Sequence, residues 1–156
     1  MPGLLIYSME IKISLIYTVA AVIVFALFDY FGFNVSLKRG WADFSNFNKY
    51  RVVQGLFQLI LTVLLFYFSG WKVAIAFNII WWTWGCDFLF YLYCEVFNYG
   101  NDRGNFRKEV KSNSVKWAWW TPYGLLFTKK GDVIKYRKLV WQAVLGTLGA
   151  VVVLLI

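Results

Sequence analysis

Four long runs of apolar residues restrict this chain to a small set of folds. They cover about residues 12–33, 52–69, 72–98 and 139–156. A helix needs roughly 20 mostly apolar residues to cross a bilayer, and it satisfies its own backbone hydrogen bonds. Because 60% of the 156 residues are hydrophobic and only 15% are charged, a soluble domain of this size could not cover its apolar surface. The sequence predicts an all-α integral membrane four-helix bundle, with residues 1–156 as one membrane domain.

The connections between the runs also carry structural signals. Ser69-Gly70-Trp71-Lys72 predicts a tight hairpin between the second and third helices. The long connection before the fourth helix is rich in Trp and Tyr, which favour the membrane boundary, so residues 115–127 are predicted to form an interfacial segment. Within this connection, Asn113-Ser114 is expected to cap a short helix that contains Trp117, Trp119 and Trp120. Pro122 and Gly124 are expected to break that helix. The following segment, LLFTKKGDVIKY, is expected to form a hairpin that turns at Lys130-Gly131.

Basic residues predict the orientation of the bundle. Four of the sixteen Lys and Arg residues lie in the 34–51 connection and ten lie in the 99–138 connection. An even number of spans separates these connections, so they share one side of the membrane, which the positive-inside rule makes cytoplasmic. Both termini then face the opposite side. Basic residues beside membrane helices favour membrane lipids as partners, and we do not expect a nucleic acid.

The residue types limit the chemistry. Histidine is absent, which removes the commonest general base and the commonest metal ligand, so no metal site or cofactor is predicted. Cys86 and Cys94 lie on the same predicted helix, about 12 Å apart at 1.5 Å per residue, which is too far for a disulfide. We expect two buried free thiols.

Polar residues within the apolar runs are the strongest functional signal, because they are costly in a membrane. Steps of four residues place a polar stripe on one face of the third helix, and the second helix has its own stripe ending at Thr62. Counting from the hairpin puts Asp87 level with about Gly55. The predicted ligand-binding residues, which share the cytoplasmic third of the bundle, are Asp29, Gln54, Gln58, Trp84, Asp87, Tyr91, Glu95 and Gln142.

Several interpretations fit this polar layer. The favoured one is a polar and aromatic pocket near the cytoplasmic leaflet that binds a lipid-like or amphipathic cationic ligand. A second is a membrane-embedded enzyme performing acid–base chemistry on a lipid or sterol, with Asp87, Asp29 and Tyr91 as candidate catalytic residues. In a third, the polar groups reach interfacial water near the helix ends. The chain could also be an accessory subunit of a larger membrane complex, or a small transporter that works as a homo-oligomer.

Overall fold

Four helices of this protein are long and apolar enough to cross a membrane. The computed structural model describes residues 2–39, 47–97, 105–115, 121–129 and 132–156. The candidate spans are Met9–Ser36, Tyr50–Ser69, Trp71–Val96 and Tyr136–Leu155. They lie in α1 (Pro2–Lys38), in α2 (Phe47–Ser69), in a continuous run of α3 (Trp71–Ile80), η1 (Trp81–Gly85) and α4 (Cys86–Val96), and in α7 (Tyr136–Leu155). Over these described residues, the prediction of an all-helical fold with four apolar helices is confirmed.

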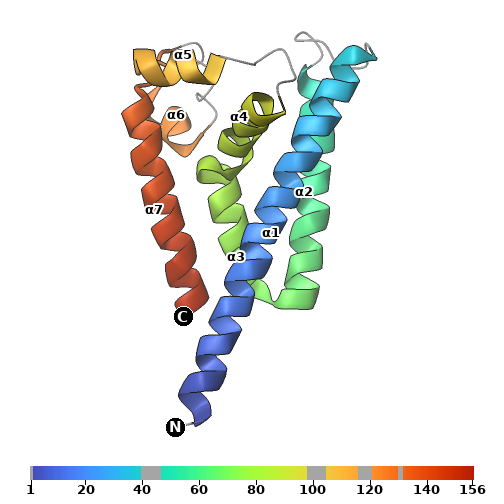
Figure 1. Cartoon of the computed structure of the whole chain (residues 1–156), viewed down its shortest axis with the longest axis vertical. Helices are drawn as coiled ribbons and strands as arrows, with labels where there is room; N and C mark the ends of the chain where they lie inside the picture. The colour runs from blue at the N-terminus through green and yellow to red at the C-terminus, as the bar shows by residue number, and fades with distance from the viewer. Residues whose placement is uncertain (1, 40–46, 98–104, 116–120, 130–131) are drawn as a thin grey trace.

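Helix α3 lies at the centre of the helices and packs against α1, α2 and α7 (Figure 1). Its inner face is formed by small and apolar side chains, including Ala76 and Phe77, which are fully buried. They pack against Phe25 of α1 and Ala150 of α7. A second apolar cluster joins α1, α2 and α4 through Tyr30, Phe33, Tyr50, Phe90 and Cys94. Both cysteines are buried free thiols, as expected.

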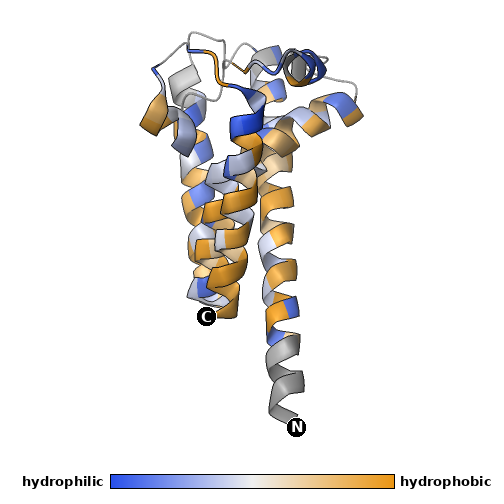
Figure 2. Ribbon diagram, turned by 90° about the vertical axis from the view of Figure 1, so that its left-hand side faces the viewer, coloured by the Kyte–Doolittle hydropathy of each residue, from blue (hydrophilic) through white to orange (hydrophobic). Residues whose placement is uncertain are grey.

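The outer faces of these helices remain apolar. Only 6% of the residues in the apolar stretch of α2 are buried inside the protein. Figure 2 shows hydrophobic residues along the length of the spans and hydrophilic residues concentrated toward one end. In water this surface would carry a large hydrophobic cost. A surrounding bilayer removes that cost, so the architecture fits an integral membrane protein.

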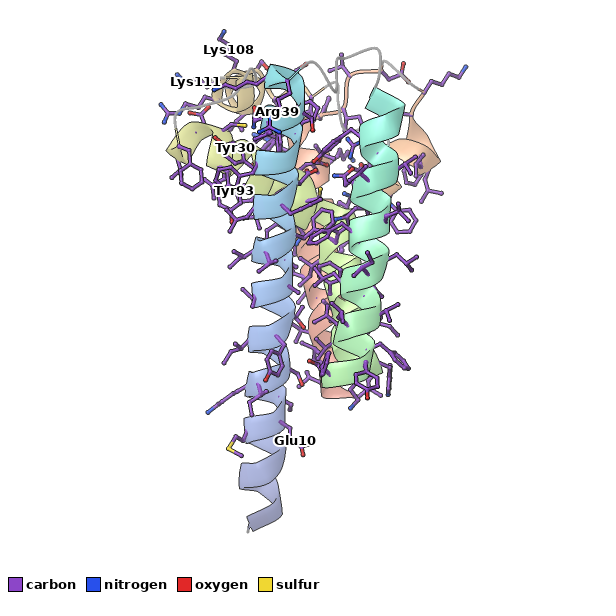
Figure 3. The ribbon with its side chains drawn as sticks, turned by 90° about the vertical axis from the view of Figure 1, so that its right-hand side faces the viewer. Glu10, Tyr30, Arg39, Tyr93, Lys108 and Lys111 are labelled. Atoms are coloured by element: carbon purple, nitrogen blue, oxygen red, sulfur yellow. The ribbon has the colours of Figure 1, made fainter. Side chains whose placement is uncertain are left out.

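The two ends of the molecule differ in charge. Both termini and the α2–α3 turn lie at one end, whereas α5 (Asn105–Ser112) and α6 (Pro122–Phe127) lie at the other (Figure 1). Figure 3 places Arg39, Lys108 and Lys111 at the α5 end and Glu10 near the N-terminus. We call these the basic end and the terminal end.

The short elements confirm one local prediction and correct others. Gly70 alone separates α2 from α3 and has φ 88°, a conformation that glycine adopts without strain. Pro122 begins α6, with the extended Thr121 as N-cap, because proline lacks only an N–H that the first helical turn leaves unbonded. The expected break at Gly124 is wrong, since Gly124 lies within α6. The predicted hairpin is also wrong over 125–127, which are helical; an isolated antiparallel bridge instead joins Val115 to Ile134. Trp117, Trp119, Trp120 and the Lys130-Gly131 turn lie outside the described residues.

Close contact between α7 and η1 depends on a glycine, and it yields a stability prediction. A methyl group at Gly146 would overlap the Thr83 side chain, whereas one at Gly149 would meet nothing within 4 Å. We expect Gly146→Ala to lower the free energy of unfolding in detergent by about 1–3 kcal/mol, because the two helices must separate. Gly149→Ala, the matched control on the same helix, should cause little change. Equal effects of the two substitutions would contradict the close packing of α7 on η1.

Candidate functional site

A buried carboxylate joins α1, α2 and α4. Asp29 accepts hydrogen bonds from Tyr50 Oη at 2.6 Å and from Gln54 Nε2 at 2.9 Å. The Cys86 thiol lies 3.4 Å from the second carboxylate oxygen of Asp29 and donates to it. Asp29 is 5% exposed and Gln54 is 2% exposed. We call these four residues the Asp29 hub.

The hub also reaches a basic side chain. The Arg51 guanidinium donates to Oε1 of Gln54, and Nε2 of the same amide donates to Asp29. A buried charge is costly unless it is paired or hydrogen-bonded. The hub meets that requirement with its own residues, so its polar groups are already engaged with one another. This arrangement indicates that Asp29 fixes the relative positions of three helices.

A separate polar network joins α2 to α3. Gln58 Nε2 donates to Asn78 Oδ1 at 2.7 Å, and Asn78 Nδ2 donates to Thr62 Oγ1 at 2.9 Å. Polar side chains in membrane helices commonly bond across a helix interface in this way. The polar stripe predicted on the second helix therefore divides, with Gln54 in the Asp29 hub and Gln58 bonded to α3.

A cavity of about 470 Å³ lies between η1–α4 and α7, next to the N-terminus of α6. This volume is within the range of small-molecule sites. Most of the wall is apolar. The hydrogen-bonding and aromatic residues that line it are Thr83, Trp84, Asp87, Phe88, Thr121, Tyr136, Gln142 and Thr147. We call this space the α4–α7 cavity.

Asp87 is the acidic residue in the wall of this cavity. It is partly buried, and among the described residues it has no hydrogen-bond or salt-bridge partner. Arg51 and Asp29 act on it only through longer-range electrostatics. Cys86, the preceding residue, points to the Asp29 hub. Neighbouring residues on a helix differ by about 100° in direction, so α4 presents one polar group to the hub and another to the cavity.

Gln142 connects the structures that surround Asp87. Its Nε2 donates to the Thr83 carbonyl oxygen at 2.5 Å, and its Oε1 accepts from the Tyr123 backbone N–H at 2.7 Å. One side chain of α7 thus holds both η1 and the first turn of α6. Gln142 was predicted as a ligand-binding residue, and the structure places it in the cavity wall with both amide atoms bonded to backbone groups.

The segment η1 determines which side chains reach the cavity. It is a π-helix of five residues, and the Cys86 N–H bonds to the Trp81 carbonyl, five residues back. Such segments leave backbone groups to be satisfied from outside the helix and are frequent at functional sites. Here the Gln142 side chain supplies a partner for the Thr83 carbonyl. Trp84 also crosses to α7, since its indole N–H lies 3.1 Å from Thr147 Oγ1.

The structure brings together only part of the predicted site. Trp84, Asp87 and Gln142 line the α4–α7 cavity. Tyr91 packs beside the apolar cluster of α1, α2 and α4, and Glu95 forms a 3.2 Å salt bridge with Arg107 of α5. Steps of four residues drift by about 40° each around an α-helix. The residues that follow Asp87 at four-residue spacing, Tyr91 and Glu95, are therefore directed away from the cavity.

Sequence reasoning missed several residues of these networks. The apolar pattern predicts Tyr50 in a connection and gives Asn78 no role, although an amide within an apolar run is itself a signal of a polar contact. The sequence predicts Cys86 as a buried thiol but does not show its contact with Asp29. Tyr136 and Thr147 line the cavity, but residues of these types at helix ends and faces are too common to be recognised without knowledge of the neighbouring helix.

Comparisons add no relative from which a role could be transferred. No family model, no curated protein and no solved structure matches this chain. Within the described part of the chain, no three Cys, Asp or Glu side chains gather in a way that could hold a metal ion. The chemistry of the candidate site must therefore be derived from Asp87 and the cavity around it.

Proposed function

We propose that this protein binds an amphipathic amine from the membrane in the α4–α7 cavity, with Asp87 as the counter-ion. The observation that carries the proposal is a carboxylate without a described hydrogen-bond partner in the wall of a largely apolar cavity. A carboxylate in such surroundings is stabilised by a cation that also donates hydrogen bonds. An ammonium group joined to an apolar chain meets both requirements.

The other cavity residues support this class of ligand. Trp84, Phe88 and Tyr136 offer aromatic rings to a cation. Ala143, Val144 and Leu148 continue the cavity along α7 with apolar side chains suited to an alkyl chain. The cavity begins beside α6 at the basic end, and the positive-inside rule orients that end toward the cytoplasm. The ligand would therefore be taken from the cytoplasmic leaflet.

Matched single-chain ligands test the proposal. Thermal unfolding of the protein in a neutral detergent is measured with dodecylamine and with dodecanol, which has the same alkyl chain and no positive charge. A ligand at one hundred times its Kd stabilises the folded state by about 2.7 kcal/mol. We expect that order of stabilisation from the amine and little from the alcohol. Equal responses would show that the cavity selects only the alkyl chain.

A cavity-filling variant locates the binding. Ala143 lines the cavity, whereas Leu145 is 65% exposed on the outer face of α7. Ala143→Phe should remove the response to dodecylamine, and Leu145→Phe should retain it. Retention by both variants would place the amine elsewhere, and a fixed copurifying protein with no amine response would favour an accessory subunit instead.

A further inference from the structure

A second cavity lies at the terminal end, away from Asp87. It has a volume of about 410 Å³ and is bounded by the N-terminal part of α1, the α2–α3 turn and the end of α7. Among the described residues, its wall contains one acidic and one basic side chain, Glu10 and Lys72. The hydroxyl residues of the wall are Ser14, Tyr17 and Ser69, and the apolar ones are Ile11, Ile13, Phe68 and Leu154.

The surrounding residues place this cavity at the level of lipid head groups. Tyr67, Phe68 and Trp71 are strongly exposed around the α2–α3 turn, as expected of aromatic side chains at a membrane boundary. The Lys72 amino group lies 5.9 Å from the centre of the Trp71 ring. Figure 3 shows Glu10 on the part of α1 that continues past the α2–α3 turn. The charged groups therefore lie where the apolar spans end.

The two opposite charges share the cavity without pairing. No salt bridge joins Glu10 to Lys72 among the described residues, and neither side chain has a further unprinted partner in that part of the chain. Opposite charges held apart in one cavity are complementary to a molecule that itself carries both charges. A carboxylate accepts hydrogen bonds from an ammonium group, and a lysine donates to a phosphate.

We propose that the terminal-end cavity binds the head group of an ethanolamine phospholipid, with its ammonium at Glu10 and its phosphate at Lys72. The three hydroxyl residues donate hydrogen bonds to phosphate or glycerol oxygens, and the apolar wall receives the start of the acyl chains. Glu10 disfavours an anionic head group through like-charge repulsion. A choline head group lacks the N–H donors that Glu10 can accept, so the ethanolamine lipid binds best.

The test uses delipidated full-length protein in neutral detergent micelles that contain dioleoyl phosphatidylethanolamine, phosphatidylcholine or phosphatidylglycerol. We expect phosphatidylethanolamine to raise the Tm by about 3–6 °C at saturation, with a smaller effect of the other two lipids. Glu10→Gln and Lys72→Gln should each lose most of this increase. Lys12→Gln changes an exposed charge on the same turn of α1 that does not line the cavity, and it should retain the increase.

The lipid-free Tm separates this proposal from a direct ion pair. If Glu10 and Lys72 stabilised each other, either single substitution would lower the lipid-free Tm, and the double substitution would cost no more than one. We expect instead that the lipid-free Tm of all variants equals that of the wild type. The proposal would be overturned if the lipid-free Tm showed a direct Glu10–Lys72 pair, or if the three lipids raised the Tm equally. It would also be overturned if Glu10→Gln and Lys72→Gln kept the wild-type increase in Tm with phosphatidylethanolamine.

Discussion

Asp87→Asn is expected to weaken the binding of dodecylamine by about 2–4 kcal/mol, which is on the order of 30- to 1,000-fold in Kd. The amide keeps the shape of the carboxylate and removes its charge, so the loss reports the ammonium–carboxylate interaction. The free energy of unfolding of the ligand-free protein should not decrease, because the substitution removes a charge that has no described partner from the wall of a largely apolar cavity. Isothermal titration and thermal unfolding of the purified variant measure the two effects separately.

Glu95→Gln is the matched control for this charge removal. Glu95 lies on α4, two turns beyond Asp87, and bonds to Arg107 outside the cavity. Its amide variant should bind dodecylamine like the wild type. Native mass spectrometry of gently purified wild type and Asp87→Asn adds the identity of any retained small molecule. Wild-type affinity in Asp87→Asn, or a large loss in Glu95→Gln, would contradict the role given to Asp87.

Asp29→Ala is expected to lower the free energy of unfolding by about 3–5 kcal/mol. The substitution removes the buried carboxylate that accepts from the Gln54 amide and the Cys86 thiol, and it leaves the Tyr50 hydroxyl only the backbone carbonyl oxygen of residue 29 as an acceptor. Each unsatisfied buried polar group costs about 1–3 kcal/mol. Tyr50→Phe removes one donor and leaves the acceptor, so its cost should be smaller, about 1–2 kcal/mol. Denaturant unfolding in detergent measures both changes.

Asp87→Ala is the matched control for Asp29→Ala, because it makes the same chemical change at an aspartate that lines the α4–α7 cavity and is not part of the Asp29 hub. We expect it to leave the stability of the ligand-free protein unchanged or slightly higher and to remove amine binding. The two aspartates thus have opposite expected profiles. A large loss of stability in Asp87→Ala together with none in Asp29→Ala would reverse the assignment of the hub and the cavity.

The helices and their register were predictable because they depend on hydropathy and on one turn. The runs of apolar residues indicated the four helices, and Gly70 marked the hairpin. Counting from that turn put Asp87 level with the residues that follow Gln54. In the structure Gln54 Nε2 lies 3.3 Å from the Sγ atom of Cys86, the residue before Asp87. Backbone rise alone therefore fixed the depth of these groups.

The division of the polar residues was not predictable from one helix at a time. A helical wheel shows which residues share a face, but it does not show which neighbour that face meets. Gln54 and Gln58 are one turn apart and bond to different helices. The α4–α7 cavity also includes Thr121, the N-cap of α6, and a proline that ends one helix gives the same sequence signal as a proline that begins another. The roles in ligand binding given to Asp87 and Gln142 remain predictions.

The π-helical segment η1 also determines where the length of this chain can change. A π-type turn encloses one residue more than an α-type turn between its bonded groups. Removal of one residue from Trp81–Gly85 would therefore give a continuous α-helix that still directs Cys86 to the hub and Asp87 to the cavity. Removal of one residue from α3 would instead rotate all of α4 by about 100°. Within this span, η1 is the place where deletion of one residue preserves the direction of both polar groups.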